Sequence, residues 1–143
     1  MPTAGDFDGA DDRTLRLAAP EVTVERLDRY LAFQRAMAAV PLSADPNAVA
    51  AAHAEAVRTS GLSAREVGEI DAVARDFAGR RAVMQRVRQR MEEAGGERRA
   101  QLEQELRGRE DDGALERRYG RAALDALKAR EAPLLALHLQ RPR

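Results

Sequence analysis

The fold is decided by residues 63–94, which read SAREVGEIDAVARDFAGRRAVMQRVRQRMEEA. Ser63 and Glu66 begin this stretch as a capping box, in which each side chain accepts a hydrogen bond from the other residue's backbone N–H. Leu62 and Val67 are spaced to form the hydrophobic staple that often accompanies such a box. These signals predict one long helix of roughly eight turns, ending near Ala94.

Apolar residues recur every seven positions along this helix. One row consists of Ile70, Phe77, Met84 and Met91, and a second consists of Val73, Arg80, Val87 and Ala94. Arg80 is the only interruption, and its side chain could pair across a helical hairpin or extend outward along its aliphatic stem. Because heptad spacing places both rows on one side of the helix, the pattern requires a partner helix.

The partner helix is predicted directly after Gly95-Gly96, which should reverse the chain. Residues 97–107 read as a returning helix, with Leu102 and Leu106 facing back, so that the two helices form a hairpin. Residues 108–113 are expected to be a second break, in which Asp112 caps the helix that follows.

Further helices are predicted on both sides of the hairpin. The first covers about Val24 to Ala39 behind the N-cap Thr23, and the second runs from Pro46 to a C-terminal stop at Gly61. A last helical region extends from about residue 114 to 139. Gly120 should interrupt it, and Pro133 should kink or restart it.

The composition supports an all-α protein. Of the 143 residues, 44% are hydrophobic and only 3% are aromatic, which favours a core of aliphatic side chains between helices. We expect a small bundle of four to six helices, built around one long helix and a helical hairpin. Residues 21–140 should form a single helical domain, and residues 1–20 a flexible acidic segment, whose charge comes from Asp6, Asp8, Asp11 and Asp12.

Several functional classes are disfavoured by the residues present. The chain has no cysteine, which excludes disulfides, thiolate metal sites and a cysteine nucleophile. Glycine-rich phosphate loops and a Gly-x-Ser-x-Gly nucleophile motif are missing from the sequence. We therefore expect no enzymatic activity, cofactor or metal. His53 and His138 are interpreted as histidines at core edges, and Gln34 as a hydrogen-bonding partner of a neighbouring helix.

Charge and hydropathy give little indication of the cellular compartment of the protein. The formal net charge is zero, and no apolar run is long enough to span a bilayer. The sequence also starts without the basic and apolar regions of a signal peptide. A cytoplasmic location is the default expectation, and export remains open if a signal was removed.

Arginines cluster on the long helix. Six of them are opposed only by Asp76, which gives a local charge of +5: Arg75, Arg80, Arg81, Arg86, Arg88 and Arg90. One interpretation is a solvated hairpin in which glutamates of the returning helix neutralise part of this charge. The other is an anionic partner, with five residues as the candidate interaction surface: Arg75, Arg81, Arg86, Arg88 and Arg90. Nucleic-acid phosphates would suit such a surface, but no exposed aromatic residue is expected among the arginines to stack bases.

Two stretches resemble known proteins. Residues 22–30, VTVERLDRY, and residues 118–127, RYGRAALDAL, are similar to short, uncharacterised helical proteins of GC-rich proteobacteria, myxobacteria among them. This resemblance implies no activity. The long hairpin also resembles small periplasmic helical stress chaperones in architecture, although Val22-Thr23-Val24-Glu25-Arg26 lacks the glutamine of their Leu-Thr-x-x-Gln signature.

Three functional hypotheses follow. The first is a non-catalytic helical protein–protein interaction module that binds another protein or itself through an apolar face. The second is binding of nucleic acid or another polyanion through the arginine-rich helix. The third is an exported, helical, chaperone-like stress protein.

Overall fold

The computed structural model describes residues 21–141, and all regular structure in this range is helical. Its helices are α2 (Val24–Ala38), α3 (Pro46–Ser60), α4 (Ala64–Glu93), α5 (Gly96–Arg109), α6 (Gly113–Tyr119), α7 (Arg121–Ala129) and α8 (Glu131–Gln140). The predicted all-α bundle, with its long helix and hairpin, is therefore confirmed. The acidic segment predicted for residues 1–20 lies outside the described residues.

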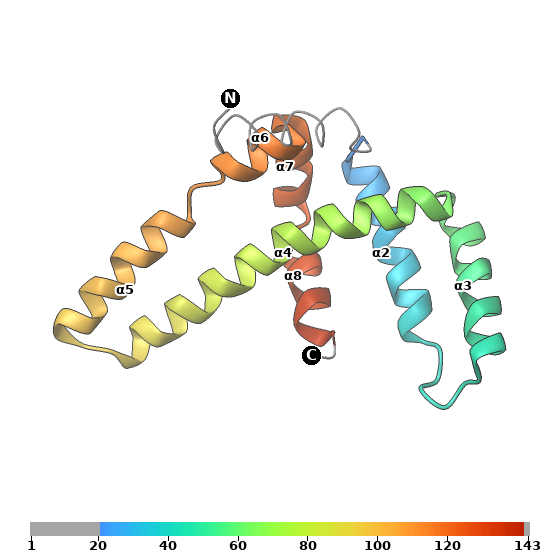
Figure 1. Ribbon diagram of the computed structural model, residues 1–143, viewed down its shortest axis with the longest axis horizontal. Helices are drawn as coiled ribbons and strands as arrows, with labels where there is room; N and C mark the ends of the chain where they lie inside the picture. Colours follow the sequence, from blue (N-terminus) through green and yellow to red (C-terminus); the bar gives the residue numbers. More distant parts are fainter. Residues whose placement is uncertain (1–20, 142–143) are drawn as a thin grey trace, which may run out of the picture.

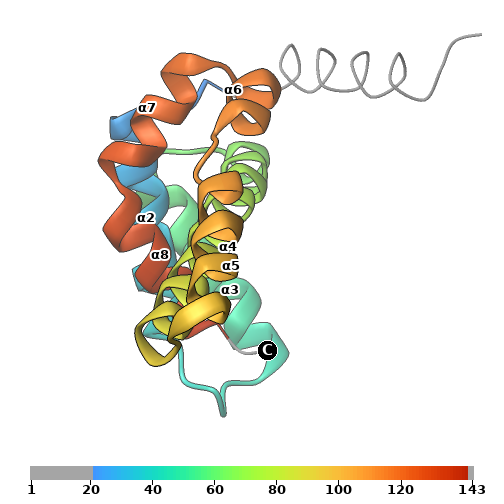
Figure 2. The ribbon, with the colours of Figure 1, turned by 90° about the vertical axis from the view of Figure 1, so that its left-hand side faces the viewer.

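Helix α4 is the long axis of the described molecule (Figure 1). Helices α2 and α3 pack together near its N-terminal half, α8 crosses its middle, and α5 returns along its C-terminal half. The turn between α4 and α5 lies at one end of the molecule, and α3 lies at the other. Viewed from the hairpin end, α2, α7 and α8 are grouped on one side of α4 and α5 (Figure 2).

The predicted helix starts are confirmed in atomic detail. The side chains of Thr23 and Asp45 each accept a hydrogen bond from the backbone N–H three residues further on, at 3.1 Å and 2.8 Å. Both hydrogen bonds of the Ser63–Glu66 capping box are present, at 3.0 Å and 3.1 Å. Gly61 ends α3 with a φ of 78°, in the left-handed region that glycine enters without steric cost. Local sequence signals therefore set the ends of these helices.

The main core lies where α2, α4, α7 and α8 meet. Leu27, Tyr30, Ile70, Phe77 and Leu127 are fully buried there and belong to one continuous apolar cluster. Each such side chain contributes about 1.5–3 kcal/mol by leaving water. This cluster ends at Phe77 on α4, so the C-terminal half of that helix extends beyond it.

The C-terminal region differs from the prediction in where it breaks. Gly120, with a φ of 91°, separates α6 from α7 as expected, but the second break falls at Arg130. Pro133 lies in the first turn of α8, where its missing N–H would have had no helical partner. It follows Ala129, the last residue of α7, by four positions, which is where a proline interrupts a helix, so the predicted restart is present and begins at Glu131. The break predicted for residues 108–113 also begins later than expected, because Gly108 lies inside α5 and this helix ends at Arg109.

Candidate interaction surface

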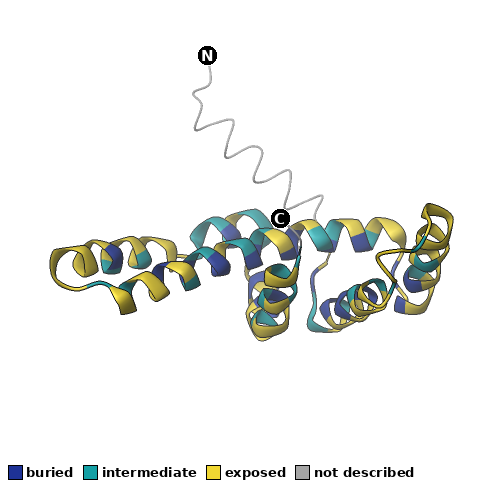
Figure 3. Cartoon of the chain, turned by 90° about the horizontal axis from the view of Figure 1, so that it is seen from below, coloured by how far each residue is buried: buried dark blue, intermediate teal, exposed yellow. Residues whose placement is uncertain are grey.

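The outer part of the α4–α5 hairpin, residues 83–110, is called the arm here. Met84, Val87 and Leu102 are buried inside it but do not belong to the main core cluster. Val83, Met91 and Leu106 remain only partly buried. Figure 3 shows that most of the arm surface is exposed, with buried positions between the two helices. The arm is therefore a two-helix layer with a small apolar seam of its own.

Most of the predicted arginine surface is paired with carboxylates. Arg75 binds Asp71 through Nε at 2.7 Å, and Arg80 binds Asp76 at 3.1 Å. Arg88 reaches Glu110 on the opposite side of the hairpin turn at 3.5 Å. These pairs lie at partly exposed positions, where an ion pair contributes about 0–1 kcal/mol. They nevertheless reduce the positive potential that the sequence alone indicates.

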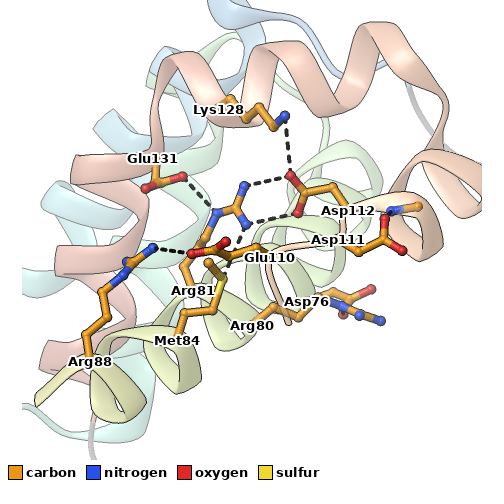
Figure 4. A network of polar contacts seen from close by, with 11 residues as sticks. Asp76, Arg80, Arg81, Met84, Arg88, Glu110, Asp111, Asp112, Lys128 and Glu131 are labelled. Atoms are coloured by element: carbon orange, nitrogen blue, oxygen red, sulfur yellow. Dashed lines mark hydrogen bonds and ion pairs between the residues drawn. The ribbon is translucent and has the colours of Figure 1, made fainter. Parts of the chain in front are cut away.

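Arg81 does not belong to the exposed surface on which it was predicted, because its side chain is buried. Its guanidinium binds both carboxylate oxygens of Asp112, at 2.9 Å and 3.0 Å, and donates from Nε to Glu131 at 2.8 Å (Figure 4). It also lies 4.8 Å from the ring centre of Phe77. We call Arg81, Asp112, Glu131 and Lys128 the clasp, since Lys128 binds Asp112 from α7 at 3.3 Å.

The clasp changes the acidity of its members. Burial raises the pKa of Asp112, but the hydrogen bonds and charges of Arg81 and Lys128 outweigh burial and hold this pKa below its usual value. Burial alone would lower the pKa of Arg81, whereas its two carboxylate partners raise it. Asp112 was predicted to cap α6, but its side chain makes no cap hydrogen bond. Its neighbour Asp111 accepts from the Gly113 N–H at 2.9 Å.

A second polar network joins α2, α4 and Arg141, the residue that follows α8. The hydroxyl of buried Tyr30 donates a short hydrogen bond to Asp71, and Arg141 reaches both groups at 2.9 Å. Gln34 donates to the same carboxylate at 3.5 Å, as expected of a hydrogen-bonding partner between helices. Burial and the Asp71 hydrogen bond raise the pKa of Tyr30 to about 12. The network therefore fixes the α2–α4 crossing.

The histidines occupy different surroundings. His53 is exposed, with its ring edge-to-face against Phe33 at a centroid distance of 5.4 Å. His138 is half-buried, and its Nδ1 has no hydrogen-bond partner within residues 21–141. Over the same range, no three histidine or carboxylate side chains come together in a way that could hold a metal ion. None of the described helices is both long and apolar enough to cross a membrane.

A groove begins on the part of α4 that precedes the arm and continues along one side of the arm. Its inner part, of about 520 Å³, is lined by Arg75, Asp76, Gly79, Arg80, Val83, Gly108, Arg109 and Asp111. Its outer part, of about 400 Å³, is lined by Val83, Arg86, Val87, Arg90, Glu105 and Arg109. Val83 and Arg109 border both parts, so we treat them as one feature, the arm groove. Five arginines therefore face it, against three carboxylates.

Arg86 and Arg90 are the arginines of this groove that the hairpin does not neutralise. Both are exposed, and neither forms an ion pair within the described part of the chain.

Searches among protein-family models, curated proteins and solved structures found no match for this chain. The candidate site therefore rests on geometry, which brings together Arg75, Arg86 and Arg90 from the predicted set and leaves out Arg81 and Arg88.

Sequence reasoning missed the contribution of α5 to the groove. Arg109 borders both parts, and Gly108 leaves space beside it. A signal was present in Gly79 and Gly108, because glycine inside a helix costs about 1 kcal/mol relative to alanine and so suggests a local reason. Reading α4 alone could not show that these two glycines border one cleft.

Proposed function

We propose that this chain is a non-catalytic helical protein–protein interaction module whose binding element is the arm. The observation that carries the proposal is the separate apolar seam of the arm, which continues beyond the main core and is covered by only one partner helix within the described chain. Val83, Met91 and Leu106 are left half-buried there. Packing a further helical surface against such a seam would remove this apolar area from water.

A second copy of the chain is the first partner to test. Residues 83–110 contain seven arginines and six glutamates, so two arms would approach with little net repulsion. Two hairpins packed together would form a four-helix bundle, which is a common way to complete a two-helix layer. Another protein with an apolar helix face would complete the same seam.

Light scattering over a range of concentrations tests this proposal. We expect a dimer that forms as concentration rises, and Met91→Gln with Leu106→Gln should raise its dissociation constant roughly tenfold, or about 1.4 kcal/mol. Leu139→Gln is the matched control, since Leu139 is 56% exposed on α8, outside the arm. Circular dichroism should show equal helix content in all variants.

The outcomes separate the two kinds of partner. Dimerisation that is weakened equally by the control would contradict a role for the arm. A single-chain mass at every concentration would remove the second copy as partner. In that case the unmodified chain and the variant with Met91→Gln and Leu106→Gln would be compared for binding to other proteins that present an apolar helix face.

Polyanion binding is the second candidate function, and it is favoured by Arg86 and Arg90, which are exposed and form no ion pair within residues 21–141. If these two arginines contact phosphates, the logarithm of the affinity should fall with the logarithm of salt concentration with a slope of about −2. A labelled DNA duplex is a suitable probe. Binding that is unchanged when Arg86, Arg88 and Arg90 become alanine would remove this candidate.

A further inference from the structure

The arm groove has features that packing within the hairpin does not require. Gly108 has no atom within 4 Å of the position a Cβ would take, and at Gly79 only the His138 ring is in ordinary contact, at 3.8 Å. Alanine would therefore fit at both positions and would stabilise each helix by about 0.5–1 kcal/mol. Because neither glycine has a positive φ, backbone geometry gives no reason for them. At Gly108 the missing side chain leaves open space beside the groove, whereas a Cβ at Gly79 would lie nearest to His138, which does not line the groove.

The groove also attracts negative charge. Arg86 and Arg90 lack ion pairs within residues 21–141, and Arg75 and Arg109 stay about half exposed beside their carboxylate partners. Partly buried Val83 lies between the two parts of the groove and adds an apolar contact. The surface therefore suits a short acidic segment that contains an apolar side chain.

We propose that residues 6–12 of the same chain, DFDGADD, occupy the arm groove. Four aspartates give this segment a charge of −4, and Phe7 supplies the apolar side chain next to two of them. The carboxylates would bind the exposed guanidinium groups, for which arginine and carboxylate geometry is well matched. Phe7 would lie against Val83. The inference goes beyond the proposed function: Val83 borders both the seam and the groove, but Met91 and Leu106, the seam positions tested above, do not line the groove.

The point of attachment places the groove within reach. Arg26 donates to the backbone carbonyl of Glu21 at 3.3 Å and binds Glu66 at 3.4 Å, so the described chain begins beside the first turn of α4. Gly79, which lines the groove, is thirteen residues after Glu66 in that helix and about 20 Å from it. The nine steps from Asp12 to Glu21 span up to about 30 Å. An intramolecular contact is therefore available without any change in the described helices.

The absence of cysteine allows a direct test in the full-length chain. Ala10→Cys combined with Gly108→Cys places one thiol in the acidic segment and one in the groove. Ala10→Cys combined with Arg65→Cys is the matched control, because Arg65 is exposed and lies beside the attachment point. We expect the groove pair to form an intramolecular disulfide about tenfold faster under the same mild oxidant, since docking raises the local concentration of the two thiols.

Charge substitutions show whether the arginines direct the contact. Arg86→Glu with Arg90→Glu should reduce the rate for the groove pair to that for the control pair, and 1 M salt should act in the same direction because it shortens the screening length to about 3 Å. Equal rates for groove and control pairs in the unmodified background would overturn the proposal. Disulfides formed only between two chains would also overturn it, since a second copy would then be the occupant. Neither result bears on the light-scattering test of the arm seam.

Discussion

Replacing Arg81 by alanine should destabilise the protein far more than the same change at Arg80. Arg81 has a side chain only 10% exposed and binds Asp112, which is 15% exposed, through two hydrogen bonds. Removing one member of a buried ion pair leaves an uncompensated charge and costs about 3–5 kcal/mol. Glu131 adds little to this loss, because it is 45% exposed and regains water when its partner is removed.

Lys128 moderates the expected loss. It already binds Asp112 at 3.3 Å and would remain as a partner in the Arg81→Ala variant. The contact of the guanidinium with Phe77, worth about 0.5–1 kcal/mol, would be lost as well. We therefore expect the free energy of unfolding to fall by about 2–3 kcal/mol, with a melting temperature lower by roughly 8 °C.

Urea denaturation followed by circular dichroism measures this difference. Arg80→Ala is the control, because Arg80 is 42% exposed and its pair with Asp76 lies within one helix, so about 0.5 kcal/mol or less should be lost. A double-mutant cycle between Arg81 and Asp112 should give a coupling energy of about 1–3 kcal/mol. If the free energies of unfolding of the Arg81→Ala and Arg80→Ala variants differ by less than about 0.5 kcal/mol, the clasp is solvated and the reasoning is wrong.

Three further predictions concern the backbone and pH. Gly108→Ala should raise the free energy of unfolding in urea by about 1 kcal/mol, whereas Gly120→Ala should lower it by about 1–3 kcal/mol because of the φ of 91°. The pKa values of Tyr30 and Tyr119 are raised from 10 to about 12, so the stability that their neutral hydroxyls contribute should be fully present below pH 10 and be lost as pH rises toward 12. If both are changed to phenylalanine, the urea midpoint of unfolding should depend less on pH over this range. The lowered pKa of Asp112 predicts the opposite pH dependence: its contribution to stability should be present above pH 3.8, the ordinary value, and be lost as pH falls below it. The free energy of unfolding of an Asp112→Asn variant should therefore fall less between pH 5 and pH 2 than that of the unmodified chain.

Local signals in the sequence were enough to predict most helix ends. The Ser63–Glu66 box, Pro46 at the start of α3 and Gly61 at its end act within one turn of the chain, and the structure confirms each of them. The hairpin followed in the same way from heptad spacing and the Gly95-Gly96 turn. Such features depend on neighbours three to seven residues away, which one sequence displays directly.

The burial of Arg81 depends on contacts that no local pattern displays. Its partners Asp112 and Glu131 are 31 and 50 residues away, on a loop and on a helix whose packing against α4 was unknown. The heptad pattern assumed one partner helix, whereas α4 contacts α5 along one half and α8 across its middle. A second partner widens the buried side of the helix, and Arg81 falls within that added part. The arm groove was missed for the same reason, since α5 supplies Arg109 and Gly108.

The clasp lies where the main core ends and the arm begins. Phe77 is the last residue of α4 in the main apolar cluster, and Arg81 follows it by one helical turn. Through Asp112 and Glu131, this one side chain connects α4 with the loop after α5 and with α8 (Figure 4). The direction of the arm is thus fixed by buried charge as well as by apolar packing. If the arm binds a partner, Arg81→Ala should weaken that binding although Arg81 lies outside residues 83–110, because a less firmly held arm loses more conformational freedom on association.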